Sequence, residues 1–226
     1  SDLILIFNSL RDGSILFYFK YYVKDQTIEL FGSSFEATSS ALSSAYMSIW
    51  LGTNIIGVLL AKPVAARFGK KTVFSWAALI SAALSFLFFL IPGDSILLIF
   101  GLNVLIGITA GIILPLGWSM YADIADYSEW KTGRRATGLV FSSSSMSQKF
   151  GWTLGGAISG WILAGFGFEP NVEQTEESLL GIRLMISVIA GIGALISFGF
   201  MRMYKLDESF MMEVKSKLDR VNSESD

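Results

Sequence analysis

The order of apolar and polar residues along this chain predicts six membrane-crossing helices. Apolar runs of about 20 residues or more alternate with polar segments, and a helix of that length crosses a hydrocarbon core about 30 Å thick. The runs cover residues 3–23, 41–61, 72–91, 95–121, 139–165 and 179–201. We therefore expect an all-α membrane protein, with a six-helix transmembrane bundle over residues 1–203 and a cytoplasmic tail over residues 204–226.

Composition supports this assignment and excludes several functional classes. Hydrophobic residues make up 52% of the chain and charged residues 16%, whereas soluble domains carry about 25% charged residues. The net charge of −2 excludes bulk electrostatic binding of nucleic acid. With no cysteine and no histidine, we expect no disulfide and no Cys/His metal site. No carboxylates cluster within a span, so we expect neither a catalytic site nor an enzyme.

The connections between the spans alternate in charge. Basic residues lie between spans two and three, between spans four and five, and after span six: Lys62, Arg67, Lys70, Lys71, Lys131, Arg134, Arg135, Arg202 and Lys205. The intervening connections are mainly acidic, so the positive-inside rule predicts that both termini lie in the cytoplasm. Six spans with both ends inside fit two inverted three-helix units, the plan of each half of a twelve-helix major facilitator transporter.

Polar and aromatic residues in the first two spans are candidates for a solute pathway. A charge near the bilayer centre costs about 2.5–3.5 kcal/mol, so Arg11 and Asp12 should face protein or water. Tyr18 and Tyr22 suit either an interfacial aromatic belt or stacking on a substrate. Asn54, a lone amide in the second span, suits either an interhelical hydrogen bond or a contact with a ligand.

Lys149 is the residue of the fifth span whose placement in a membrane costs the most free energy. It lies about ten residues into the helix, or about 15 Å by helical rise, which is too deep for its ammonium to reach the interface easily. It shares a stripe with Ser145 and Trp152. The pairs Gly151–Gly155 and Gly156–Gly160 allow close helix contacts. Lys149 therefore forms either a structural salt bridge within the bundle or part of a water-filled pathway, facing a carboxylate or substrate hydroxyls.

The connection after the fourth span carries both signs of charge. Asp123, Asp126 and Glu129 follow at intervals of three, so they project from one side if the helix extends that far. Lys131, Arg134 and Arg135 follow in the same connection, and Arg67 and the lysines between spans two and three, Lys62, Lys70 and Lys71, are candidate partners. The cluster forms either a surface network, in which exposed pairs contribute about 0–1 kcal/mol each, or a latch that closes the cytoplasmic side of a transporter during alternating access.

Several of these residues together resemble a known family. The segment Ala122–Tyr127 (ADIADY), then Glu129, Lys131–Gly133 (KTG), Arg135 and Lys149–Gly151 (KFG) are similar to the glycoside–pentoside–hexuronide:cation symporters, which include melibiose permease. The likeness covers essentially the whole chain, as helices seven to twelve of a twelve-helix protein. It implies a sugar symporter of the bacterial inner membrane coupled to sodium, protons or lithium.

The resemblance also implies roles for individual residues. Lys149 would be needed for transport and would lie near the sugar and cation sites, and Asp123, Asp126, Glu129 and Arg135 would join a cytoplasmic charge network. Many members carry glutamate where this chain has Thr137, so that role is not carried over.

The same likeness sets the expected partners. They are a missing amino-terminal six-helix half, a sugar or glycoside, and the lipid bilayer. No cofactor is expected beyond the coupling cation, Na⁺ or H⁺, whose site lies mostly in the missing half. The alternatives are a family member that moves a non-sugar solute, or a non-transporting membrane sensor or subunit.

Overall fold

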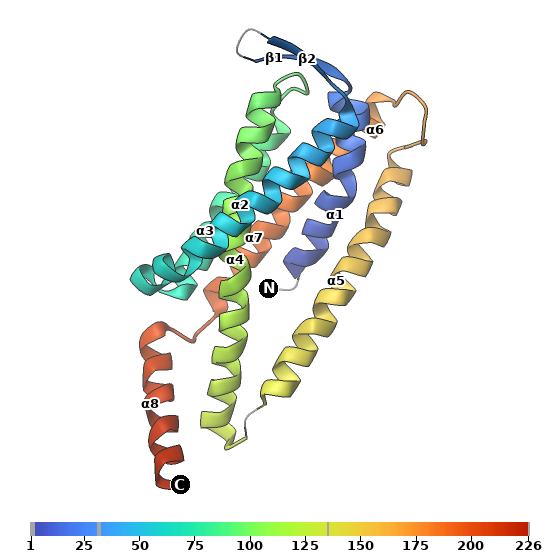
Figure 1. The fold of residues 1–226 in the computed structure, drawn as a ribbon. Coiled ribbons are helices and arrows are strands. Elements are labelled where there is room, and N and C mark those ends of the chain that lie inside the picture. Colours follow the sequence, from blue (N-terminus) through green and yellow to red (C-terminus); the bar gives the residue numbers. More distant parts are fainter. Residues whose placement is uncertain (1–2, 31–32, 135, 226) are drawn as a thin grey trace.

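The computed structural model describes residues 3–30, 33–134 and 136–225, which form a bundle of long helices with one short hairpin (Figure 1). In chain order the elements are α1 (Leu3–Phe17), the π-helical turn η1 (Tyr18–Val23), β1 (Gln26–Leu30), β2 (Ser33–Ala37), α2 (Ser39–Phe68), α3 (Lys70–Phe89), α4 (Ile96–Thr132), α5 (Thr137–Gly165), α6 (Glu176–Leu184), the π-helical turn η2 (Met185–Ile189), α7 (Ala190–Met203) and α8 (Glu208–Ser225). Because α1 continues into η1, and α6 continues through η2 into α7, each predicted span corresponds to one helical rod.

The rods differ in how readily they would enter a membrane. In the described part of the chain, four are long and apolar enough to cross one: α2, α3, α4 and the combined rod Glu176–Met203. The two others, α1 with η1 and α5, are those that the sequence interrupts with Arg11, Asp12 and Lys149. These two pack against each other, and α1 also packs on α7. The charged helices are therefore held in place by more apolar neighbours.

Small residues set the spacing between α2 and α4. A Cβ built on Gly57 would overlap the backbone carbonyl oxygen of Ile108, and one built on Gly111 would overlap that of Asn54. The sequence places Gly107 and Gly111 on one small face of the fourth span, and the structure confirms that this face meets the neighbouring helix. Glycine is required here because the two backbones lie in direct contact.

We expect Gly111→Ala to destabilise the bundle by about 1–3 kcal/mol, because the added methyl group meets backbone that cannot move aside without shifting a helix. The thermal midpoint of the purified protein in detergent should fall by roughly 5 °C. Gly117→Ala is the matched control, since a Cβ at this position of the same helix meets no atom within 4 Å. Equal midpoints for the two variants would contradict the assigned contact.

The connections between the helices lie at the two ends of the bundle. The α2–α3 turn, the α4–α5 connection and α8 lie at one end, and the β1–β2 hairpin, the α3–α4 turn and α6 lie at the other (Figure 1). The basic connections recognised in the sequence are therefore brought to the same end of the molecule. This end is called the basic end below.

The second helix extends beyond its predicted end. The sequence marks Pro63 and Gly69 as the helix end and a tight turn, because proline removes a backbone hydrogen-bond donor. Helix α2 continues past Pro63 to Phe68 and ends at Gly69, with φ of +81°. Ala61 and Ala65 are buried in a cluster that includes side chains of α3 and α4. Tertiary packing thus stabilises a turn that local sequence alone disfavours.

The polar segment between η1 and α2, whose composition is typical of a linker, contains two paired strands. Strands β1 and β2 pair antiparallel, with Gln26 opposite Ala37. The Gln26 side-chain amide donates to the backbone oxygens of Val23 and Gly93, each at 2.8 Å. These bonds fasten the hairpin to the end of η1 and to the turn between α3 and α4.

Candidate functional site

One face of α5 is left uncovered by the rest of the described chain. Lys149 and Trp152 are exposed and Ser145 is half-buried, and they follow one another along the helix at intervals of three and four residues. A Cβ at Gly156 or Gly160, further along the same stripe, would meet no atom within 4 Å. This open face is the one that the sequence predicts as the lining of a pathway.

The opposite face of α5 packs on α1. Gly151, Gly155 and Ser159 are buried there, and a Cβ built on Gly155 would lie 2.5 Å from the Cβ of Ser9. The Ser9 hydroxyl donates to the backbone oxygen of Trp152 at 3.1 Å. Of the two glycine pairs recognised in the sequence, the first therefore makes a helix contact, whereas the second lies on the open face.

Lys149 carries its charge near the middle of α5. It lies about 18 Å from the start of a helix about 43 Å long. Among the described residues, no carboxylate lies within salt-bridge distance of its ammonium. The hydrogen bond that Thr153 donates at 2.9 Å goes to the backbone oxygen of Lys149 and leaves the side chain unengaged. The ammonium can therefore meet a group from outside this part of the chain.

Arg11 and Asp12 occupy different environments. Arg11 is 6% exposed, its Nη2 donates to the Tyr46 hydroxyl at 3.1 Å, and its guanidinium lies 5.8 Å from the Phe88 ring centroid. It thus fills a site between α1, α2 and α3, within the bundle. Asp12 is half-buried on a neighbouring face of α1. The structure does not bring either residue together with Lys149 through a hydrogen bond or ion pair.

The two candidate tyrosines pack within the bundle. Tyr18 is 1% exposed, and its ring lies 5.2 Å from that of Tyr22 and 5.6 Å from that of Phe88. Arg183 places its guanidinium 4.8 Å from the Tyr22 ring centroid, and its Nη2 donates to the backbone oxygen of Phe89 at 2.7 Å. Arg183 lies within the last predicted span, and the fold gives it a cation–π role joining three elements.

An asparagine joins α2 to α4, but from the α4 side. Asn103 is fully buried, and its side-chain amide donates to the backbone oxygen of Tyr46 at 2.8 Å. Asn54 is half-buried, and its backbone lies against Gly111. The interhelical amide bond that the sequence offers to Asn54 is therefore made by Asn103.

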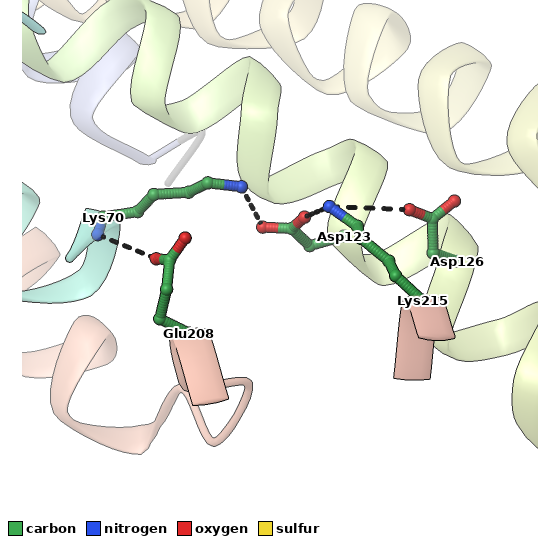
Figure 2. A network of polar contacts seen from close by, with 5 residues as sticks. All are labelled: Lys70, Asp123, Asp126, Glu208 and Lys215. Carbon is green, nitrogen blue, oxygen red and sulfur yellow. Dashed lines mark hydrogen bonds and ion pairs between the residues drawn. The ribbon is translucent and has the colours of Figure 1, made fainter. Parts of the chain in front are cut away.

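A second group of charges lies at the basic end, where α3, α4 and α8 meet. Asp123 is 4% exposed, and its two carboxylate oxygens accept from Lys70 at 2.6 Å and from Lys215 at 3.1 Å (Figure 2). Lys215 also lies 4.0 Å from Asp126. Glu208 accepts from the backbone N–H of Lys70 at 3.4 Å, where a negative charge favours the start of α3. We call this group the Asp123 cluster.

The residues predicted to form the cytoplasmic charge network differ in their surroundings and contacts. Helix α4 extends to Thr132, as required for Asp123, Asp126 and Glu129 to share one side, and Glu129 is half-buried. Arg67 is exposed, with its guanidinium 5.4 Å from the Phe68 ring centroid, and Lys70 occupies the place beside Asp123. Arg135 lies outside the described residues. Lys215 was not predicted from the sequence. The available signal was the apolar stripe of the helix that carries it, which includes Met211 and Val214.

Helix α8 is docked on α4 by its apolar side. Met211 and Val214 are buried, and the Phe210 ring lies 5.9 Å from Tyr127 and 5.8 Å from Trp130. The apolar stripe of the tail helix thus packs on the helix that carries Asp123. Its contacts hold Lys215 beside the carboxylate.

A cavity of about 480 Å³ lies between α8 and the start of α3, and Asp123 and Tyr204 both line it. Burial raises the pKa of the Tyr204 hydroxyl, and the nearby negative charge of Asp123 adds to the rise. The hydroxyl therefore stays protonated at neutral pH. The cavity places a neutral donor and a paired carboxylate at the joint between the tail helix and the bundle.

Comparison with known proteins gives one matching family and several similar proteins. A family model described as MFS/sugar transport protein matches residues 9–208. The chain is 30% identical over 212 residues to the putative glycoside/cation symporter YagG of Escherichia coli K12, covering 93% of this chain and 43% of the relative.

Two further relatives extend the comparison. The chain is 35% identical over 181 residues to the putative sulfoquinovose importer of Salmonella typhimurium, covering 76% of this chain and 37% of that protein. It is 34% identical over 177 residues to an uncharacterized 29.9 kDa protein of Pseudescherichia vulneris, covering 76% and 65%. The chain thus spans less than two thirds of the length of each relative.

Proposed function

Because the chain belongs to the MFS/sugar transport protein family, we propose that it forms the carboxy-terminal half of a cation-coupled sugar or glycoside symporter. Membership of this family and the four helices of membrane-crossing length make it a multi-pass membrane protein of a transporter class rather than an enzyme class. The glycoside/cation symporter among its relatives supports the choice of solute and of coupling. In this proposal Na⁺ or H⁺ moves with the sugar, and no covalent step occurs.

The observation that carries the proposal is the open face of α5. A charge at the centre of a bilayer costs about 2.5–3.5 kcal/mol and marks a solute or ion pathway when it faces polar surroundings. Lys149 meets this description, because it lies mid-helix, is exposed, and shares its stripe with Ser145 and Trp152. In the proposed transporter this face lines the central pathway, where the ammonium would meet substrate hydroxyls or a carboxylate of the other half.

A second six-helix half is part of the proposal. The relatives are longer than this chain, and substrate sites of such transporters lie at the interface between structural repeats. Both termini of this segment would lie in the cytoplasm of a bacterial cell, with the basic end facing inward. The Asp123 cluster would then lie at the cytoplasmic mouth. Its ion pairs would act as a latch that is formed in one state of the alternating-access cycle and broken in the other.

An anionic solute is the alternative that a specific observation favours. One relative is named as a putative sulfoquinovose importer, and Lys149 offers a cation without a carboxylate partner in the described chain. An ammonium in a low-dielectric pathway would stabilise a sulfonate or carboxylate more strongly than a hydroxyl. A non-transporting sensor would have no need of a polar open face at this depth.

We expect the 226-residue chain on its own to give no ion-driven sugar uptake in membrane vesicles, because half of the pathway is missing in this proposal. The full-length transporter should take up a glycoside when a sodium or proton gradient is imposed. A panel of neutral sugars, glycosides, sugar acids and sulfonated sugars, tested with and without each gradient, separates the candidates. Robust uptake by the chain alone would refute the half-transporter proposal, and uptake of sulfonates alone would select the anionic alternative.

A further inference from the structure

A groove between α3 and α7 opens on the outer surface of the basic end. Its volume is about 540 Å³, and its lining includes Lys71, Thr72, Trp76, Phe198 and Arg202. We propose that this groove binds a phospholipid with an anionic headgroup. The inference concerns α3 and α7, whereas the proposed solute pathway runs along α5, on the other side of the bundle in Figure 1.

The mouth of the groove is cationic. Arg202 is exposed, and its guanidinium lies over the Phe198 ring at 5.7 Å. No carboxylate among the described residues lies within salt-bridge distance of it. Within the described part of the chain, the Lys71 ammonium makes one ion pair, a long one at 3.5 Å with the exposed carboxylate of Asp207. Two side chains can therefore direct positive charge at one phosphate, with the hydroxyl of Thr72 beside them.

The inner wall of the groove is apolar. Positions 71, 72, 75, 76 and 79 fall on one face of α3, and this face changes from Lys71 and Thr72 to Trp76 and Leu79 over about 12 Å. Trp76 is 61% exposed, and tryptophan concentrates where headgroups meet acyl chains. This order of charge, hydroxyl, tryptophan and aliphatic side chain matches a phospholipid lying along the helix with its headgroup at the basic end.

The position of the groove agrees with such a ligand. Both walls belong to helices of membrane-crossing length, and Arg202 is the second-last residue of the last such rod. Basic pockets between transmembrane helices recognise anionic headgroups. If the proposed orientation holds, the lipid belongs to the cytoplasmic leaflet. The binding itself depends only on the groove and not on the transport function.

Native mass spectrometry of the detergent-solubilised protein tests this site, with phosphatidylglycerol titrated against phosphatidylethanolamine. Arg202→Gln should weaken phosphatidylglycerol binding about fivefold, and adding Lys71→Gln should weaken it about fivefold again. Asp207→Asn, which frees Lys71, should strengthen binding about twofold. Phosphatidylethanolamine binding should change by less than about twofold in all three variants.

Lys205→Gln is the matched control, because this exposed cation lies three residues from Arg202 but does not line the groove. An equal loss in Lys205→Gln and Arg202→Gln would overturn the site, since the preference would then reflect bulk surface charge. Displacement of the lipid by an equal concentration of glycerol 3-phosphate would overturn it in favour of a site for soluble phosphates. Thermal midpoints without added lipid should match the wild type, and Lys71→Gln alone provides the same test if Arg202→Gln does not fold.

Discussion

Replacing Lys149 by glutamine is expected to abolish solute uptake by the full-length transporter while leaving its amount in the membrane unchanged. The ammonium is exposed and has no carboxylate partner in the described chain, so its removal leaves no buried charge uncompensated. In the proposed transporter the ammonium contacts the solute inside the pathway, and loss of one partner from such a buried charged contact costs about 2–5 kcal/mol, which corresponds to a fall in uptake of about thirtyfold or more. Vesicle uptake, normalised to the membrane content of the transporter, measures the effect.

Two further variants define the role of the charge at Lys149. Lys149→Arg keeps the charge with a different geometry and should retain more uptake than Lys149→Gln. Lys62→Gln is the control for a general loss of positive charge, because Lys62 is an exposed lysine on α2 and lines none of the sites described here. Unimpaired uptake by Lys149→Gln would remove Lys149 from the pathway. Loss of the protein from the membrane would instead assign it a structural salt bridge with another part of the transporter.

The helices could be predicted from the sequence because run length is a local property. Apolar runs of membrane-crossing length predict the six rods, but their ends depend on tertiary contacts. Pro63 ends a helix in isolation, whereas in the fold the burial of Ala61 and Ala65 carries α2 on to Phe68. The hairpin was missed because its short strands lie in a polar segment that looks like a linker, and the bond from Gln26 to Gly93 joins segments that are distant in sequence.

The sequence predicted which charged and polar residues belong to the candidate site, because their placement in a membrane costs free energy. It did not predict which contacts these residues make. The sequence shows that Lys149 lies mid-helix, yet only the packing of Gly155 on Ser9 decides which side of α5 remains open. The spacing of the acids on α4 predicts that they share one side. The choice of Lys70 and Lys215 as partners depends on how α3 and α8 fold back onto α4, which no local pattern encodes.

The resemblance to the symporter family adds information of a different kind. It named the family correctly, and it assigned roles to residues whose contacts it could not supply. Arg11, which the resemblance does not assign and which the sequence marks only by the cost of its charge in a membrane, is placed within the bundle beside Tyr46 by the fold. The energetic cost of placing a charge in a membrane thus identifies which residues need a partner, and the fold identifies that partner.

Replacing Asp123 by asparagine is expected to slow transport at least about tenfold while changing solute affinity less than about twofold. Asp123 is 4% exposed and pairs with both Lys70 and Lys215, and hydrogen bonds to charged groups contribute about 1.5–3 kcal/mol each. Asparagine keeps the size of the side chain and weakens both pairs. The state in which the proposed latch is closed therefore loses stability relative to the state in which it is open. Solute equilibrium binding and the rate of solute exchange in proteoliposomes separate the two effects.

The double-mutant cycle of Asp123→Asn with Lys70→Gln tests whether the pair acts as one unit. A coupling energy of about 0.5–3 kcal/mol in the exchange rate is expected for residues in direct contact. Glu213→Gln is the control, because its pair with Lys217 at 2.6 Å is exposed on α8, and exposed helix pairs contribute only about 0.3–0.5 kcal/mol. Lost affinity at an unchanged exchange rate would move Asp123 from the latch to the solute site. Additive single effects would separate Lys70 from the latch, since two residues that open and close as a pair must report the same transition.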